Sequence, residues 1–168
     1  PTYTSTGVYV DLQPIFDAMK EMGVKVALDT SGEPLSYWVK KGTASVLKPN
    51  AEELASAVGR ELRTIGDVVD AAREVCGFGT DLVLASMGSD GILAVTKNGA
   101  WAAKTPPVKV INTVGAGDAF GATFVSQLLK GVSLDNAIRA GVINSAAALE
   151  HLDATTGLLD QEELDELV

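Results

Sequence analysis

Cysteine is almost absent from this sequence. Cys76 is the single cysteine among 168 residues, so no disulfide can form within the chain. Its position on the apolar stripe of an expected helix favours a small buried hydrophobic residue over a reactive thiol. Proteins of reducing compartments typically lack disulfides, and we therefore expect a cytoplasmic protein.

Basic residues are also scarce, with 13 Lys and Arg against 22 Asp and Glu and a formal net charge of −9. An acidic surface repels nucleic acid and anionic lipid, so we expect neither as a partner. No apolar run approaches the roughly 20 residues of a membrane span. Residues 1–7 lack the basic and apolar regions of a secretory signal. They also lack an initiator methionine, which suggests a processed chain or a fragment.

What the chain does contain is enough apolar material for a core, with 46% hydrophobic and 21% charged residues. Apolar residues alternate between helical spacing and short continuous runs, a pattern typical of a mostly parallel sheet covered by helices. We therefore predict one α/β domain over residues 1–168. The expected strands are 24–28, 45–47 and 81–86, and the expected helices begin near residues 12, 34, 50, 64, 115, 133 and 160.

The alternation changes in the middle of the chain. Runs 92–96 and 101–104 flank Asn98 and Gly99, a pair that predicts an antiparallel hairpin with a type I′ turn. A further strand is expected at 108–111, leading into the most informative part of the sequence.

Residues 112–120 join that strand to an amphipathic helix and contain two closely spaced glycines, Gly115 and Gly117. Glycines let the backbone turn tightly and approach a ligand, and free amides at a helix start bind anions such as phosphate. Asp118 lies in the first helical turn, where a carboxylate is either a capping group or a base beside a bound phosphoryl group.

Two common nucleotide-binding motifs do not fit this stretch. No G-x-x-x-x-G-K-[ST] motif is present, which excludes a P-loop. The glycines at 115, 117 and 121 miss G-x-G-x-x-G by one residue, because position 120 is Phe. A dinucleotide-binding (NAD-type Rossmann) domain is therefore a weaker alternative.

Residues 112–122 resemble the second signature of the ribokinase (phosphofructokinase-B type) family, Asp/Asn-Thr-x-Gly-Ala-Gly-Asp followed by small residues. Asn112 and Thr123 depart from it, since many members have Asp at the first position and Gly or Ala at the second. The resemblance implies that Asp118 is the catalytic base and that the amides of Gly115, Ala116 and Gly117 form an anion hole.

Other segments agree with this family in order and spacing. Residues 48–53 resemble its N-x-x-E motif, which implies that Asn50 helps to bind ATP and that Glu53 holds Mg²⁺ through water. The same pair also fits a helix capping box. The remaining ATP-binding residues implied by the resemblance are Ser86, Gly88 and Gly91 of a glycine loop, Gly117, and Val142 and Asn144 of the adenine pocket. His151, the only histidine, matches no family site and is expected at the surface.

The resemblance implies a ribokinase-like (Rossmann-like) fold, with a mostly parallel sheet, helices on both faces and one antiparallel hairpin. It covers only the C-terminal half of the family's usual length, so the fold is expected to be partial. Segments 29–32, 48–50 and 154–157 are most similar to the branch of 1-phosphofructokinases and tagatose-6-phosphate kinases.

The sequence leaves three alternative functions open. The first is ATP- and Mg²⁺-dependent phosphoryl transfer to a sugar or sugar phosphate. The others are a non-catalytic nucleotide-binding half and the NAD-type domain. No segment resembles the family's Gly-Gly-x-x-x-Asn sugar signature. We therefore expect a truncated or cleaved piece, one chain of a split enzyme, or an evolved or engineered half. An exposed apolar edge would then favour self-association or pairing with a missing N-terminal half.

Overall fold

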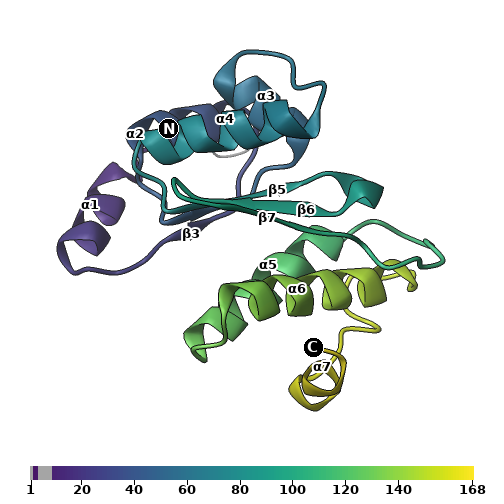
Figure 1. The fold of residues 1–168 in the computed structure, drawn as a ribbon. Helices are drawn as coiled ribbons and strands as arrows, with labels where there is room; N and C mark the ends of the chain where they lie inside the picture. Colours follow the sequence, from purple (N-terminus) through teal and green to yellow (C-terminus); the bar gives the residue numbers. More distant parts are fainter. Residues whose placement is uncertain (1, 4–8) are drawn as a thin grey trace. The chain divides into compact units, whose positions relative to one another are not determined.

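The computed structural model describes residues 2–3 and 9–168, so most of the stretch 1–7 discussed above lies outside the described residues. The chain divides into two compact units. Unit 1 comprises Pro1–Met87 with Leu93–Ala100, and unit 2 comprises Gly88–Ile92 with Trp101–Val168. A five-stranded sheet has the order β3-β4-β5-β6-β7 (Figure 1). A separate antiparallel pair, β1 with β2, was not expected from the sequence.

Unit 1 is built on three parallel strands. Val46 pairs with Ala27 on one side and with Leu82 on the other. The strands and helices follow one another as in βαβ units, in which each parallel strand is reached through a helix. The elements are β2 (Tyr9–Val10), α1 (Gln13–Glu21), β3 (Ala27–Leu28), α2 (Gly32–Lys41), β4 (Val46–Leu47), α3 (Ala51–Val58), α4 (Ile65–Gly77), β5 (Leu82–Ser86) and β6 (Ile92–Val95), with β1 at Thr2–Tyr3.

The core of unit 1 lies where α2, α3 and α4 pack against the sheet. Leu54, Val75 and Val83 are fully buried in it. Cys76 is buried there too, with its Sγ 3.5 Å from the Val95 carbonyl oxygen. Burial raises the pKa of the Cys76 thiol, which therefore stays protonated. The expectation of a small buried residue is confirmed.

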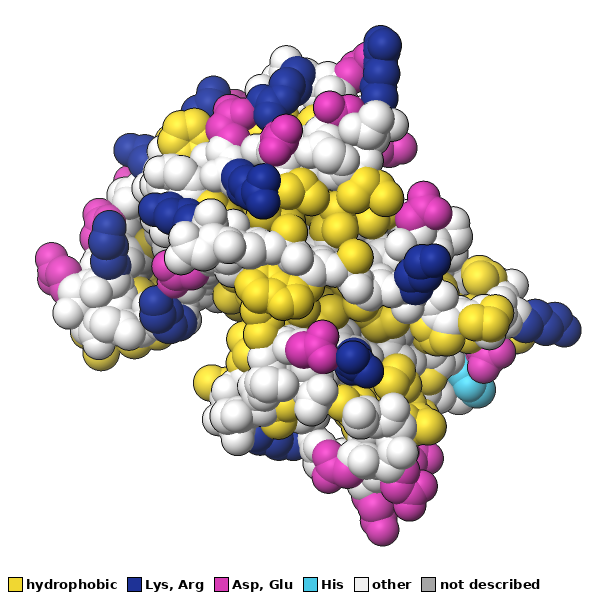
Figure 2. Space-filling view, viewed as in Figure 1, with side chains coloured by type: hydrophobic (Ala, Val, Ile, Leu, Met, Phe, Trp, Pro, Cys, Tyr) yellow, Lys and Arg dark blue, Asp and Glu magenta, His cyan; other side chains and the backbone are white. Residues whose placement is uncertain are grey.

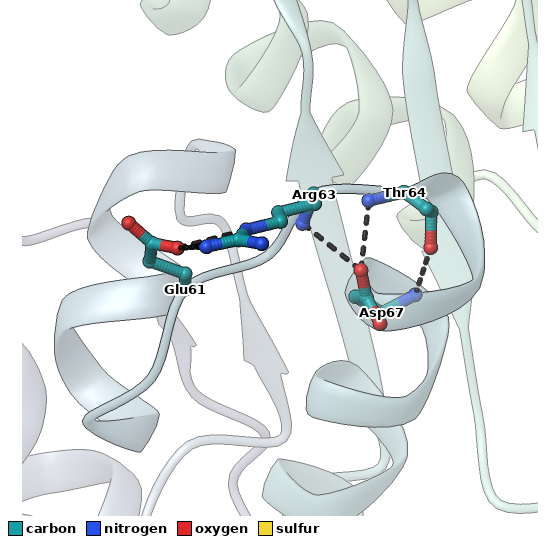
Figure 3. Close-up of polar contacts among 4 residues, drawn as sticks. All are labelled: Glu61, Arg63, Thr64 and Asp67. Carbon is teal, nitrogen blue, oxygen red and sulfur yellow. Dashed lines mark hydrogen bonds and ion pairs between the residues drawn. The ribbon is translucent and has the colours of Figure 1, made fainter.

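Side-chain caps determine where several helices begin. In α4, Thr64 Oγ1 accepts from the Asp67 backbone N–H at 3.1 Å, and Asp67 Oδ2 accepts from the Thr64 N–H at 2.8 Å (Figure 3). This reciprocal pair is a capping box, and the same arrangement begins α3 at Asn50. The predicted starts of α3 and α4 are confirmed because a polar cap marks each one.

Unit 2 is formed largely by two long helices, α5 (Ala116–Leu129) and α6 (Leu134–Leu149), joined through Gly131. Phe120 and Phe124 of α5 stack at 5.9 Å between ring centroids. A Cβ added at Gly141 of α6 would lie 2.8 Å from the Phe120 ring, so the two helices approach closely at this glycine. The unit also contains the 3-10 turn Gly88–Asp90, α7 (Gln161–Leu167) and most of β7 (Ala100–Ala103), whose first residue belongs to unit 1. Acidic side chains gather over α7 (Figure 2).

Three local predictions are wrong. No strand forms at 108–111, because its backbone bonds to the end of α6, Ile111 N–H donating to the Leu149 carbonyl at 2.8 Å. The β6–β7 hairpin exists, but no described non-glycine residue has a positive φ, which excludes a type I′ turn. Thr96 N–H instead donates to the Gly99 carbonyl at 2.9 Å, so Lys97 and Asn98 form the loop.

The third difference concerns the strand expected at 24–28. Only Ala27 and Leu28 form β3, at the edge of the sheet, and Val24 is 45% exposed. A continuous apolar run suits a strand that is buried on both faces. Here β3 is an edge strand, with β4 as its one partner among the described residues. Elsewhere, no helix within the described part of the chain is both long and apolar enough to cross a membrane.

Candidate functional site

The glycine turn of unit 2 leads directly into α5. Gly115 is the N-cap and has φ +86°, a conformation that glycine adopts without strain. Asn112 Oδ1 accepts from the Val114 N–H at 3.1 Å, which tightens the approach to the turn. The first amides of a helix have no partner within it, and α5 has no side-chain cap, although the Ala116 N–H makes a long bond of 3.4 Å to the Thr113 carbonyl before the helix. The turn is therefore suited to bind an anion.

Asp118 is exposed at the third position of α5. Acidic residues at the same position of other helices, Glu53, Asp67 and Glu163, each reach back to the N-cap amide in a capping box. Asp118 makes no such bond, and no hydrogen bond or ion pair of its carboxylate is found among the described residues. The carboxylate is therefore not committed to capping and stays available beside the glycine turn.

A loop that follows α6 packs against this turn. A Cβ at Gly115 would lie 2.5 Å from the Ala154 Cβ, so only glycine fits beneath Ala154. Asn112 Nδ2 donates to the Leu152 carbonyl at 2.7 Å. Asp153 Oδ1 accepts from the backbone amides of Thr156 and Thr155, at 2.6 and 2.9 Å. These bonds, with that to Thr156 the largest cause, hold the pKa of the Asp153 carboxyl below its usual range, so the loop has a charged anchor.

The residues predicted in unit 1 gather at the carboxyl ends of β4 and β5. Asn50 and Ser86 form a parallel bridge, and Ser86 N–H donates to the Pro49 carbonyl at 3.0 Å. Ligands of open α/β sheets bind at this edge. Asn50 Oδ1 accepts from the Glu53 N–H and Glu53 Oε2 from the Asn50 N–H, both at 2.8 Å. The capping interpretation of this pair is thus confirmed, and one carboxylate oxygen of Glu53 remains outside the box.

Lys48 lies at the same edge and was given no individual role from the sequence. Its side chain is only 16% exposed, and its Nζ lies 2.9 Å from Asp29 Oδ2, just beyond β3. A half-buried cation where parallel strands end places a positive charge, paired with Asp29, at an edge that also carries the Glu53 carboxylate. The sequence feature that could have indicated this role is the position of Lys48 directly after the strand β4.

The predicted glycine loop has the backbone that its glycines allow. Gly88 and Gly91 have φ +58° and +92°, and a Cβ at Gly91 would lie 2.0 Å from the Ala103 carbonyl oxygen. Thr105 Oγ1 donates to the Gly88 carbonyl at 3.4 Å, which ties the loop to the segment after β7. The loop therefore exposes backbone at Gly88 in a conformation that larger residues adopt only with strain.

Two predicted adenine-pocket residues lie inside α6. Val142 is 7% exposed and Asn144 is 6% exposed. Both polar atoms of the Asn144 amide have protein partners: Nδ2 donates to Thr123 Oγ1 and Oδ1 accepts from the Leu159 N–H, each at 2.8 Å. His151 is partly buried, and its ring lies against Gly157. None of these side chains projects freely into solvent.

A magnesium site built from protein groups alone does not occur in the part of the chain that the structure describes, where no cluster of three His, Cys, Asp or Glu could hold a metal. Mg²⁺ commonly binds through one or two carboxylates together with substrate phosphates and water. The free Glu53 oxygen beside Asn50 fits that mode of binding.

Comparison with known proteins agrees with these features. Residues 10–161 match the pattern of the pfkB family carbohydrate kinases. The chain belongs to this family. A 1-phosphofructokinase of Haloferax volcanii is 41% identical over 122 residues, which cover 73% of this chain and 39% of that protein. The ATP-dependent 6-phosphofructokinase isozyme 2 of Escherichia coli is 36% identical over 82% of this chain and 45% of its own.

Solved structures of the family share the fold. The phosphofructokinase-2 of Escherichia coli, crystallised with potassium, superposes with a TM-score of 0.82 at 32% identity, over 93% of this chain and 50% of that one. An Arabidopsis thaliana ribokinase with ribose and ATP gives 0.81 at 24% identity and supports the fold alone. The ribokinase-like α/β fold predicted from the sequence is confirmed. The chain spans less than half the length of the two curated relatives named above.

Proposed function

We propose that this chain is the nucleotide-binding and proton-accepting part of an ATP-dependent sugar-phosphate kinase of the 1-phosphofructokinase kind. Membership of the pfkB family and the names of its relatives support the reaction class and favour it over a dinucleotide-binding domain. The observation that carries the proposal is Asp118. Its carboxylate, alone among the four acids at the third position of described helices, is not used for capping.

The proposed reaction is a direct in-line transfer. Asp118 accepts the proton of the acceptor hydroxyl as the hydroxyl oxygen bonds to the γ-phosphorus and the bond to ADP breaks. The amides of Gly115, Ala116 and Gly117 bind the oxygens of the transferring group, with the positive end of the α5 dipole behind them. No covalent intermediate with the protein is needed.

Nucleotide binding uses the strand ends and loops described above. Asn50 and Ser86 border the phosphates from β4 and β5, and the backbone of Gly88 and Gly91 follows them. Val142 and Asn144 form the supporting wall of the adenine site from within α6. Bound Mg²⁺ would neutralise phosphate charge, and Glu53 would hold it through water.

Replacing Asp118 with Asn tests the proposed base. We expect turnover with fructose 1-phosphate or fructose 6-phosphate to fall at least about 100-fold, because an amide cannot accept the proton. ATP affinity, measured by calorimetry, should stay within about threefold because the backbone amides remain. Asp135→Asn is the matched control, since Asp135 lies in the first turn of α6 and pairs with Arg139. Near-normal turnover of Asp118→Asn, measured with the remainder of the enzyme supplied where needed, would exclude the base role.

A second candidate function is nucleotide binding without catalysis. The observation that favours it is length, since the chain covers 39–45% of the two curated relatives named above. Saturable binding of ATP with Mg²⁺, weakened by Gly117→Val but without turnover on any sugar phosphate, would support this second candidate. The open edge at β3 suits pairing with a second copy or with a chain that carries the remaining strands.

A further inference from the structure

Two polar side chains are buried between α5 and α6, where apolar packing would be the rule. Thr123 is 8% exposed and Asn144 is 6% exposed. Asn144 Nδ2 donates to Thr123 Oγ1, and Asn144 Oδ1 accepts from the backbone N–H of Leu159, both at 2.8 Å. Buried amides are retained where both their donor and their acceptor are satisfied. Here the acceptor, Asn144 Oδ1, binds a backbone N–H of a segment that belongs to neither helix.

That segment runs from the end of α6 to the start of α7 and is held at several points. Its beginning is tied at the Leu152 carbonyl by Asn112, at 2.7 Å. Its end is tied at Leu159 by Asn144, and beyond it Gln161 Oε1 accepts from the buried Gln127 Nε2 at 2.8 Å. We call residues 152–159 the strap. Between its two ties, Ala154 lies directly on Gly115.

The three atoms nearest to a Cβ added at Gly115 all belong to Ala154, so the strap closely covers this glycine. Gly115 has φ +86°, one of several conformations open to a glycine, so the turn has no intrinsic reason to keep it. The covering strap restricts that freedom. The direction of the amides that follow Gly115 then depends on how firmly the strap is held.

We propose that Thr123 and Asn144 are positioning residues for the anion-binding turn. Asn144, oriented by the Thr123 hydroxyl, holds Leu159 and thereby keeps the strap on Gly115, which fixes the direction of the Gly115–Gly117 amides. The inference rests on the proposed nucleotide site for its consequence in binding, whereas the coupling of strap and turn is a property of the free chain. A role in helix packing alone would require only the shape of the two side chains.

The test compares three substitutions that separate shape from hydrogen bonding. Thr123→Val keeps the shape and removes the hydroxyl, Thr123→Ser keeps the hydroxyl, and Ile138→Val reduces packing at a residue of α6 that is 2% exposed and has no polar side-chain atom. Amide hydrogen exchange is followed in the full 168-residue chain without nucleotide, at the glycine turn and along the strap. Asn144→Leu serves as a second variant, should Thr123→Val fail to fold, because it removes the tie together with the side-chain amide and frees the Leu159 N–H from its acceptor.

We expect Thr123→Val to speed exchange about tenfold or more along the strap and at the Ala116 amide of the turn, which donates to the Thr113 carbonyl, and Thr123→Ser to restore rates within about twofold of the parent chain. Ile138→Val should lower the unfolding midpoint without this local change. Calorimetry with ATP and Mg²⁺ should show about fivefold weaker binding for Thr123→Val but not for Thr123→Ser or Ile138→Val, because a preorganised turn is lost.

Equal exchange at the turn in Thr123→Val and Ile138→Val would overturn the positioning role. An unchanged ATP affinity despite faster exchange at the turn would overturn the consequence for binding. If the parent chain binds no ATP, the proposed function fails on its own, and the exchange comparison still decides whether the strap positions the turn.

Discussion

A carboxylate in the first turn of a helix has two different environments in this chain. Glu53, Asp67 and Glu163 each accept from the backbone amide of their N-cap residue. Asp118 follows a glycine N-cap in the left-handed conformation and makes no cap. Sequence position alone could not separate these cases, because all four acids occupy the third helical position. The N-cap residue differs, being Asn, Thr or Asp in the boxes and Gly before Asp118.

The capping box of α4 gives a prediction of pH dependence. Hydrogen bonds from Thr64 and from the Arg63 backbone hold the pKa of Asp67 below 3.8 (Figure 3). A lowered folded-state pKa contributes stability that is present above the unfolded pKa and is lost as pH falls through the folded one. We expect the parent chain to exceed Asp67→Asn in stability at pH 7, and the difference to vanish well below pH 3.8.

Urea unfolding at pH 7, 5 and 2 measures this difference, the lowest point lying well below 3.8. Asp70→Asn is the matched control, since Asp70 lies on the same helix outside the box. A difference between parent and Asp67→Asn that persists unchanged at the lowest pH would show that the ionised carboxylate is not what stabilises the helix start.

At the scale of whole elements, two helices of unit 1 end on glycines in the same left-handed conformation but with different surroundings. Gly42 follows α2 with φ +59°, and a Cβ there would lie 1.9 Å from the Phe78 carbonyl oxygen. Gly59 follows α3 with φ +71° and has no atom within 4 Å of such a Cβ. The turn after α2 is therefore packed against the end of α4, and the turn after α3 is open.

Alanine substitutions at these two glycines should differ. Gly59→Ala should cost about 1–2 kcal/mol, the usual penalty of the left-handed conformation for a residue with a Cβ. Gly42→Ala should cost clearly more, because backbone atoms of α4 must also move. Thermal unfolding of the two variants measures the difference, and equal losses would show that the contact with Phe78 yields without cost.

The elements that could be predicted from the sequence are those with local signals. Helices α3, α4 and α6 begin where Asn50, Thr64 and Ser133 mark a cap, and β5 is the buried apolar run that was expected. The errors arose where distant partners decide the backbone. The 108–111 segment bonds to the end of α6, and the hairpin loop is shifted by one residue because the Thr96 hydroxyl accepts from Asn98 and Gly99 amides.

The candidate site was predictable to a similar degree. The glycine turn, Asn50, Ser86 and the glycine loop were predicted from spacing and family resemblance. Each has backbone geometry that its residues allow, and their binding roles stay predictions. The burial of Asn144 and its bond to Leu159 were not predictable, because they depend on how the strap returns across α5 and α6. Contacts of this kind carry no regular spacing.

At the scale of the whole molecule, the outer edge of β3 has no partner strand among the described residues. The backbone carbonyls of Val26 and Leu28 accept hydrogen bonds from the β4 side. Because the backbone polar groups of successive strand residues point to opposite sides, the N–H and C=O of Ala27 face the open edge. An unprotected edge of this kind pairs with other strands. We expect the chain to self-associate at high micromolar concentration.

Ala27→Pro tests whether this edge is responsible. Proline removes the outward N–H while leaving the bonds of Val26 and Leu28 to β4 in place. Sedimentation velocity should show less association for Ala27→Pro than for the parent, with Ala27→Ser unchanged. A parent chain that sediments as a monomer throughout the range would show that the edge is not adhesive.

The buried Cys76 allows the opening of unit 1 to be measured through the reactivity of its thiol. It is the only thiol in 168 residues and is 0% exposed, so a maleimide dye has one target and reaches it only when unit 1 opens. The labelling rate in native buffer therefore counts opening events without an introduced probe. Protection of the thiol by added ATP would then measure how strongly occupancy of the nucleotide site is linked to the core beneath β5, in a single reaction followed by fluorescence.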